Sequence, residues 1–415
     1  MPKTGFSCCY QPLRHTTQAL ALGLLLLSTP VNADNAGKVA QSDDQQAILI
    51  KACRDEDRLR FRGITARLEN DIFAGSDQNY TSGITFAAVS RDLVGRLKTE
   101  CMPAPVRLHA ELIKWLDSDY WLNSSNTSHS QNVVVKFGQS IYTPKDFSRT
   151  DLILDDRPYA GLLYVGMSWN RRKHGAQNTT DLLDTREIIL GVIGPMSLAE
   201  ESQNQVHAAR GNDQFLGWRN QLHNEPALQL ALDRKFKRYR GADNDTPGFS
   251  ADSIRSVGIR LGNIETSATV GIEGRIGWNL PNDFGTYPIK PGAENRAPAL
   301  ARPAALASAG ETPDADQSQQ VEPAPRKMRP GIHLFSTLEA KYVAHDFSLD
   351  GNLFRSSHSV TRRPWLAQAG VGISAQGQLA GRGIKMAVMH IFRTREFEQQ
   401  VRNPAYGSIA LSLEF

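Results

Sequence analysis

The chain ends in YGSIALSLEF (residues 406–415), and this stretch decides how the rest of the sequence is interpreted. Its last eight residues alternate between two sets, apolar Ile409, Leu411, Leu413 and Phe415 against Ser408, Ala410, Ser412 and Glu414. A period of two with one apolar face predicts a half-buried antiparallel strand. A terminal aromatic residue in register with that apolar face is typical of the last strand of an outer-membrane barrel.

The same alternation recurs upstream, from residue 62 onward. We predict about twelve strands, near 62–74, 80–91, 132–143, 158–171, 184–194, 225–239, 252–263, 265–279, 331–345, 358–375, 382–395 and 404–415. Segments of about ten residues separated by turns suit a transmembrane antiparallel β-barrel. Such a barrel is closed, so every backbone group is paired inside lipid. The alternative is a soluble β-sandwich whose last strand happens to end in Phe.

Composition narrows the class of protein. The 415 residues carry a formal net charge of +4, from 47 basic and 43 acidic side chains, which is too mild a surplus to predict nucleic-acid binding. Four cysteines are too few for a disulfide scaffold. No run of about 18 apolar residues occurs, so a transmembrane helix is excluded, whereas the weaker signal of a transmembrane barrel is not.

The N-terminus predicts export. Residues 1–33 resemble a secretory signal peptide, with Lys3 and Arg14 before a short apolar run and a small-residue cleavage site at Ala33. Residues 34–60 are polar and predict a flexible mature N-terminus, ahead of a barrel over 61–415. Cys53 and Cys101 remain after cleavage, and an oxidising compartment would permit a disulfide between them.

Three connections stand out. With an even number of strands and both termini in the periplasm, the connection 195–224 lies outside the cell, and its periodicity predicts a helix over 198–210. The insertion 92–131 predicts a short amphipathic helix at 105–117. Residues 288–330 are rich in Pro and Ala and predict a disordered insertion on the periplasmic side.

Polar residues gather where the first two strands meet. Glu69, Asn70 and Asp71 end the first strand, and Tyr80 and Thr81 begin the second, so their side chains meet across a hairpin at the outer rim. Asn70 and Asp71 should face opposite sides of a regular strand, but a bulge would let both reach one site. The alternative is an ordinary polar hairpin tip.

A second cluster joins QSIYTP (139–144) to DRPYAG (156–161). Arg157 could hold a phosphate or a carboxylate. The interpretation that we favour is a girdle of interfacial tyrosines with a structural ion pair.

The third cluster lies in the helical extracellular loop. Gln203 precedes His207 by one helical turn, so both lie on one face, and Asp213 follows the helix. A histidine with hydrogen-bonding neighbours can act as a general base near neutral pH. On composition alone, a solvated histidine is the alternative.

Several of these motifs, in this order, resemble one family. ENDIFAGSDQNYTSG, QSIYTPKD, DRPYAGLLY, GPMSLAEESQNQVH and WNLPNDFG are similar to segments of the outer-membrane lipid A 3-O-deacylases. The resemblance covers residues 61–285 strongly and the final strands in pattern only. It implies a twelve-stranded barrel that depends on Ca²⁺ and hydrolyses the ester of the 3′-acyloxyacyl group of lipid A.

The resemblance also implies residue roles. His207 matches the catalytic base, Asn70 and Asp71 match the pair near calcium, and Gln203 and Asp213 match supporting positions of the loop. Asp213 stands where the family has a longer Glu, and we expect it among the metal ligands.

Thr81 would orient water or substrate, and Glu69 and Tyr80 would support the site. We expect a monomer in the bacterial outer membrane, with lipopolysaccharide as substrate and the active site facing outward. Two alternatives stay open: an outer-membrane phospholipase, and a non-enzymatic porin-like or binding barrel.

Overall fold

The computed structural model describes residues 53, 58–71, 79–94, 99–116, 129–173, 180–238, 247–286 and 328–415. The signal peptide predicted at 1–33 lies outside these residues, as do nearly all of the stretch 34–60 and all but the last three residues of the insertion 288–330. From Cys53 onward the chain forms one compact unit.

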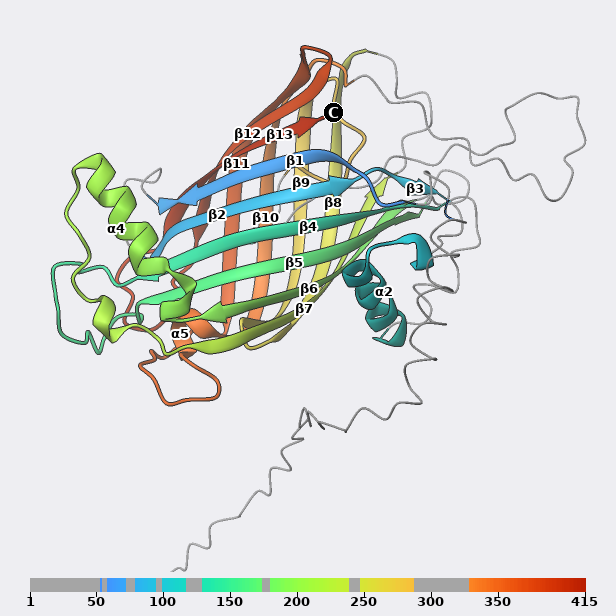
Figure 1. Ribbon diagram of the computed structural model, residues 1–415. Coiled ribbons are helices and arrows are strands. Elements are labelled where there is room, and N and C mark those ends of the chain that lie inside the picture. Colours follow the sequence, from blue (N-terminus) through green and yellow to red (C-terminus); the bar gives the residue numbers. More distant parts are fainter. Residues whose placement is uncertain are drawn as a thin grey trace, which may run out of the picture. The chain divides into compact units, whose positions relative to one another are not determined.

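The described strands form a single antiparallel sheet (Figure 1). Its thirteen strands are β1 (Phe61–Asn70), β2 (Asn79–Ser90), β3 (Leu93–Val94), β4 (His129–Thr143), β5 (Ala160–Lys173), β6 (Thr180–Ile193), β7 (Glu225–Arg238), β8 (Phe249–Gly262), β9 (Glu265–Trp278), β10 (Gly331–Asp346), β11 (Trp365–Leu379), β12 (Arg382–Arg393) and β13 (Ala405–Glu414). Because β3 has only two residues, the wall consists of the other twelve, as predicted.

The sheet closes on itself. The last strand, β13, pairs with β1 from Gly63–Glu414 to Asn70–Gly407, and β2 pairs with β4 past the short β3. Closure satisfies the backbone groups that an edge strand would expose to lipid. The predicted fold class, a transmembrane antiparallel barrel of about twelve strands, is therefore confirmed.

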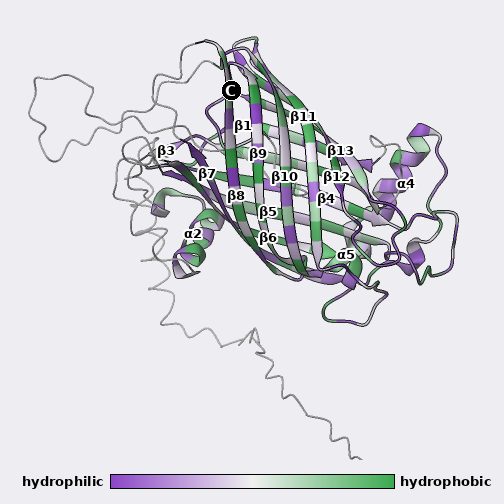
Figure 2. Ribbon diagram, turned by 180° about the vertical axis from the view of Figure 1, so that it is seen from behind, coloured by the Kyte–Doolittle hydropathy of each residue, from purple (hydrophilic) through white to green (hydrophobic). Residues whose placement is uncertain are grey.

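The two faces of the wall have opposite chemistry. On β1, Ile64 and Leu68 point outward and are exposed, whereas Thr65, Arg67 and Glu69 point inward and are buried. Figure 2 shows the resulting alternation of hydrophilic and hydrophobic positions along the strands. An apolar exterior around a polar interior is the inverse of a soluble protein and is typical of a barrel in lipid.

Side chains fill much of the interior. Lys136 of β4 forms a buried ion pair with Glu187 of β6, with 2.5 Å between Nζ and Oε1, and Glu187 also accepts from Ser168 of β5. Phe335, Met389 and Tyr406 form an apolar cluster on the inner side of β10, β12 and β13.

One chain segment enters this interior. Asn282, Asp283 and Phe284, from the connection after β9, contact inward-facing basic side chains of four strands. The contacts are Arg172 to the Asn282 carbonyl (3.0 Å), Lys237 to the Asp283 carbonyl (2.9 Å), Lys235 to the Phe284 carbonyl (3.1 Å), and Lys385 and Arg275 to the Asp283 carboxylate. Arg172, Lys235 and Lys237, from the two basic stretches of the sequence, therefore face the lumen and hold the segment across the bore.

Helices lie near both ends of the barrel (Figure 1). At one end are α4 (Ala199–Arg210) and the short α5 (Phe347–Asp350); at the other is α2 (Ala104–Leu116). The predicted helices at 198–210 and 105–117 are thus confirmed within one residue. None of the described helices is long and apolar enough to cross a membrane.

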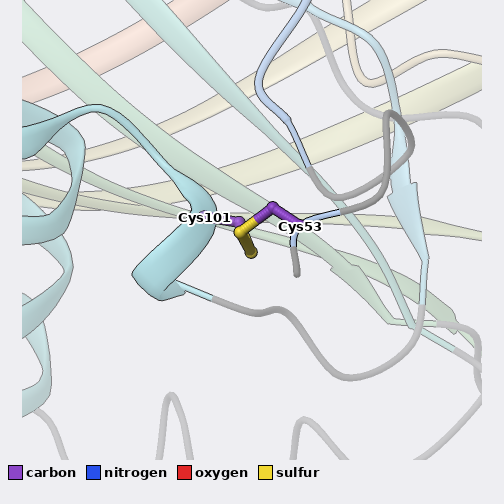
Figure 3. The surroundings of a disulfide bond; sticks show 2 residues. All are labelled: Cys53 and Cys101. Atoms are coloured by element: carbon purple, nitrogen blue, oxygen red, sulfur yellow. A yellow bond between two sulfur atoms is a disulfide. The ribbon is translucent and has the colours of Figure 1, made fainter. Parts of the chain in front are cut away.

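A disulfide joins Cys53 to Cys101, which ends the short helix η4 (Thr99–Cys101) just before α2 (Figure 3). The sequence left this bond open. In the structure it ties the N-terminal part of the unit to the start of α2.

Several strand boundaries differ from the predictions by three or four residues, and the largest difference is at the start of β11. The strand predicted at 358–375 begins at Trp365, because Pro364 has no N–H for the sheet and the preceding residues fold over the rim. There the Val360 N–H donates to the Leu349 carbonyl (2.9 Å), and His358 Nε2 lies 2.8 Å from the Asp156 carbonyl. The first strand, predicted to reach 74, ends at Asn70.

The segment inside the bore gives a testable prediction. Asp283→Ala removes the carboxylate between Arg275 and Lys385, so we expect this barrel to lose on the order of 2 kcal/mol of stability and to conduct ions in planar bilayers. The parent protein should show no steady conductance. Asp151→Ala, which breaks an exposed ion pair with Arg149, is the matched control and should show no ion conductance. If the Asp283→Ala barrel conducts no ions and is as stable as the parent, the segment 282–284 does not block the bore.

Candidate active site

The helix α4 packs against the outer face of the barrel wall, where it contacts β4 and β5. It buries Ala199, Gln203 and His207, which are spaced by four residues and so lie on one helical face. In Figure 1 the helix lies beside the ends of β5, β4 and β2, away from α2. The predicted pair Gln203 and His207 therefore faces the wall.

The start of α4 rests on a glycine. A Cβ atom on Gly161 of β5 would lie 2.1 Å from Ser197 Oγ and 2.3 Å from Ala199 Cβ, so only glycine permits this approach. Gln139 of β4 adds a hydrogen bond from its Nε2 to the Ser197 carbonyl, at 2.6 Å. These contacts set the position of the helix on the wall.

Aromatic side chains hold the segment that follows α4. Tyr159 and Trp218 have ring centroids 4.9 Å apart, and they form a buried cluster with Ile141, Ala199 and Phe215. Burial raises the pKa of Tyr159 to about 12. The cluster is a fixed apolar support beneath the helix.

The end of α4 positions the histidine. Gly211 has a φ of 68°, a left-handed conformation that favours glycine at a helix C-terminus, and the Asn212 N–H donates to the His207 carbonyl at 2.9 Å. The chain then reverses. This reversal brings the Asp213 carbonyl to 2.7 Å from His207 Nδ1 and the Phe215 ring edge-on to the imidazole, with centroids 5.1 Å apart.

The contact with Asp213 fixes the chemistry of the imidazole. A carbonyl oxygen only accepts hydrogen bonds, so Nδ1 of His207 must carry the proton when the ring is neutral. The lone pair is then on Nε2, the nitrogen that can take a proton from another group.

Gln203 lies one turn before His207 and is also buried, at 3% exposure. Within the described part of the chain, neither its amide nitrogen nor its amide oxygen has a hydrogen-bond partner. Buried polar groups are nearly always satisfied, so an amide in this state indicates a site for a ligand, an ion or water. Such a site would lie next to His207, the candidate general base.

The first strand reaches the same outer face. Asn70 pairs with Ser82 of β2, Ser82 with Ile141 of β4, and Ile141 with Gly161 of β5. This row of outward-facing positions spans three strand spacings, or about 14 Å. The buried face of α4 runs about 12 Å from Ala199, on Gly161, to His207. The row therefore places Asn70 on the same outer face of the wall as the seat of α4, about one helix length from Gly161.

The second strand is irregular at the predicted site. The register between β2 and β4 shifts between Tyr80 and Ser82, so Thr81 is the additional residue of a β-bulge. Bulges re-aim side chains and are frequent next to active sites. The side chains of Tyr80 and Thr81 lie outside what the structure describes.

Asp71 follows directly after β1 and is buried, at 1% exposure. Two other predicted residues are placed differently. Glu69 faces the barrel interior, where its carboxylate lies 4.0 Å from Arg67, on the opposite face of β1 from Asn70. Asp213 is exposed and touches His207 through its main-chain carbonyl.

The second sequence cluster is structural. Arg157 forms a buried ion pair with Glu396 in the connection between β12 and β13, which confirms the predicted ion pair. The predicted girdle of tyrosines is wrong. Tyr142 packs inward, edge-on to Phe347, and Tyr159 is buried under α4, because both rings find partners in the rim connections rather than lipid.

The residues near the rim suit a hard cation by their chemistry. The described residues contain no group of three or more His, Cys, Asp and Glu side chains arranged to hold a metal. Asp71 offers a carboxylate, and Asn70 and Gln203 offer amide oxygens. Oxygen donors of this kind are the ones that calcium prefers.

Most of the residues that position His207 carry no signal in the sequence, although Asp213 is predicted to support the site. Phe215 and the Asp213 carbonyl contact the ring, and Gly161 and Ser197 seat the helix. The motifs DRPYAG and GW contain several of these residues, yet their contacts to α4 depend on tertiary structure.

Comparisons with known proteins agree with this architecture. The family model described as "Outer membrane protein LpxR" matches residues 20–415. Among solved structures, LpxR from Salmonella typhimurium is 16% identical, with a TM-score of 0.55, and the match covers 85% of this chain and all of that one. At this identity the likeness concerns the fold alone.

Other barrels are less similar. The translocator domain of the autotransporter NalP from Neisseria meningitidis is 8% identical, with a TM-score of 0.30 over 92% of this chain and 96% of that one. The β-domain of the Bordetella autotransporter BrkA is also 8% identical, with a TM-score of 0.39 over 86% and 100%. Both TM-scores are below 0.5, so neither bears on the fold. Comparison with curated protein sequences gives no match.

The seat of α4 gives a second prediction. Gly161→Val would push Ser197 and Ala199 away from β5, so we expect faster hydrogen exchange of the α4 amides, by at least about tenfold, in a barrel that still folds. The matched control is Gly274→Val, because a Cβ there meets nothing within 4 Å. Equal exchange in both variants would show that the close approach at Gly161 does not fix the helix.

Proposed function

Because this chain belongs to the LpxR family of outer membrane proteins, we propose that it hydrolyses the 3′-O-linked acyloxyacyl ester of lipid A in the outer leaflet. One observation carries the proposal. His207 lies on the wall-facing side of α4 with Nδ1 held by a backbone carbonyl, which is the arrangement of a general base. The motif resemblance to lipid A 3-O-deacylases supplies the substrate class.

The reaction needs no nucleophilic side chain. His207 Nε2 takes a proton from water, and the resulting hydroxide attacks the ester carbonyl carbon. The tetrahedral intermediate then collapses, and the bond from the acyl carbon to the sugar oxygen breaks. The imidazolium returns its proton to that oxygen, which leaves the 3′-hydroxyl and a free 3-acyloxyacyl acid.

Gln203 would act on the developing charge. Its amide N–H is buried, is one turn from His207 and has no hydrogen-bond partner among the described residues, so it could donate to the oxyanion of the intermediate. Donors aimed at a developing oxyanion in a site that excludes water are among the largest contributions to catalysis. Thr81, the additional residue of the bulge in β2, would orient water or substrate.

Calcium fits the donor chemistry of the rim. Asp71 and Asn70 would hold it, and Asp213, whose carboxylate is exposed, is proposed as a further ligand. When bound there, calcium would supply a Lewis acid that polarises the ester carbonyl. The site would face the cell exterior, where lipopolysaccharide forms the outer leaflet.

Replacement of the base gives the third prediction. We expect His207→Ala to lower the rate of lipid A deacylation by about 10²–10⁴-fold, because general-base catalysis contributes that much. Mass spectrometry of lipid A incubated with detergent-purified barrel measures the loss of the acyloxyacyl unit. His223→Ala, an exposed histidine at the same rim, is the control and should retain activity.

The same assay separates the alternatives. An active parent with a fully active His207→Ala variant would refute the role of the histidine. A folded parent that cleaves phospholipids instead would favour a phospholipase, and one that cleaves neither lipid would favour a non-enzymatic barrel.

Metal removal gives the fourth prediction. A chelator should abolish deacylation while the barrel stays folded, and added Ca²⁺ should restore it. Asp71→Asn should raise the Ca²⁺ concentration needed for half-maximal activity by at least about tenfold, because one anionic ligand becomes neutral. Asp151→Asn, at an exposed ion pair, is the control. Full activity in chelator would rule out the metal.

A further inference from the structure

The helix α2 has two apolar sides. One side buries Val106, Ala110 and Ile113 against the barrel wall. The other exposes Leu108, Leu112 and Trp115, which at spacings of four and three residues form a continuous stripe. Exposed fractions of 72%, 40% and 79% are high for such side chains.

The polar residues of α2 occupy a third, narrow strip. Arg107, Glu111 and Lys114 follow one another at spacings of four and three residues, and Glu111 and Lys114 lie 3.9 Å apart as an exposed pair. At 100° per residue, this strip lies between the wall-facing side and the exposed stripe. Among the described side chains of α2, the only other polar group is that of His109, which is buried, so the exposed surface outside this strip is largely apolar.

The wall beneath α2 shows where the helix lies relative to lipid. The helix covers the paired row Val135–Met167–Ile188 on the outer face of β4, β5 and β6. The next outward row toward α4 is Phe137–Val165–Leu190, and all three of its side chains are exposed. Because this row belongs to the lipid-facing surface of the barrel, α2 lies directly at the edge of that surface.

The position of α2 is also fixed covalently at its start. The Cys53–Cys101 disulfide and the buried Met102 lie just before the helix, and Trp169 of β5 packs under it. The helix is thus held next to the wall, and its exposed stripe faces away from the wall at the edge of the lipid-facing surface.

From these observations we propose that α2 is an interfacial membrane helix, whose Leu108, Leu112 and Trp115 insert into the phospholipid leaflet at the end of the barrel opposite α4. Continuity with the lipid-facing row identifies the occupant as phospholipid. The strip Arg107–Glu111–Lys114 faces the head groups and water. Tryptophan at such a boundary places its ring at the level of the head groups. This proposal is independent of the proposed enzymatic activity.

Fluorescence quenching tests the proposal. The parent protein and Trp115→Phe are reconstituted in vesicles of phosphatidylcholine and phosphatidylglycerol, with or without bromine atoms high on the acyl chains. The difference in fluorescence between the two proteins is the signal of Trp115. Because the Trp115 side chain is exposed, its replacement by Phe should not disturb the fold. We expect brominated lipid to remove more than about half of this signal, and aqueous iodide to remove little. Strong quenching by iodide and none by bromine would overturn the proposal.

A second pair of variants keeps the test specific. Leu108→Glu combined with Leu112→Glu should move Trp115 out of lipid and reduce bromine quenching at least about twofold. Glu111→Gln combined with Lys114→Gln, on the polar strip, should leave it unchanged. Heat-modifiable mobility in detergent electrophoresis confirms that each barrel is folded. Equal quenching in the parent and both double variants would contradict insertion of the stripe.

Discussion

Every other feature of this protein depends on the pairing of β1 with β13. Inside lipid an unpaired strand edge costs several kilocalories per mole for each exposed backbone group, so the sheet must close. The register from Gly63–Glu414 to Asn70–Gly407 achieves this and brings the first and last strands together. Closure also fixes which face of each strand meets lipid, because a slip of one residue would turn every side chain to the other face.

The candidate site follows from that fixed register. Asn70, Ser82, Ile141 and Gly161 form one outward row because four strands are paired without freedom to slide. The glycine at one end of the row admits α4, and the helix presents Gln203 and His207 to the wall. The tight turn after Gly211 then supplies the carbonyl that holds His207. A rigid wall thus positions residues from connections that are far apart in the sequence.

Much of this was predictable from sequence, since a period of two marks each strand and a helical periodicity marks α4. Other parts were not. The Arg157–Glu396 pair joins residues 239 positions apart, and no local pattern indicates which carboxylate an inward arginine will meet. Similarly, the contact of His207 with Asp213 uses a backbone carbonyl, and a backbone group carries no side-chain signal in the sequence. Tyr142 and Tyr159 were assigned to lipid because aromatic residues near a rim usually face it, and the folded rim connections bury them instead.

The central claim is that water, activated at His207, cleaves the bond between the acyl carbon and the sugar oxygen of lipid A. Deacylation in water enriched in ¹⁸O, followed by mass spectrometry of both products, tests it most directly. We expect one ¹⁸O atom in the carboxyl group of the released 3-acyloxyacyl acid and none in the deacylated lipid A. Label in the sugar hydroxyl, or no release of the acid by a folded, calcium-supplied barrel, would contradict it.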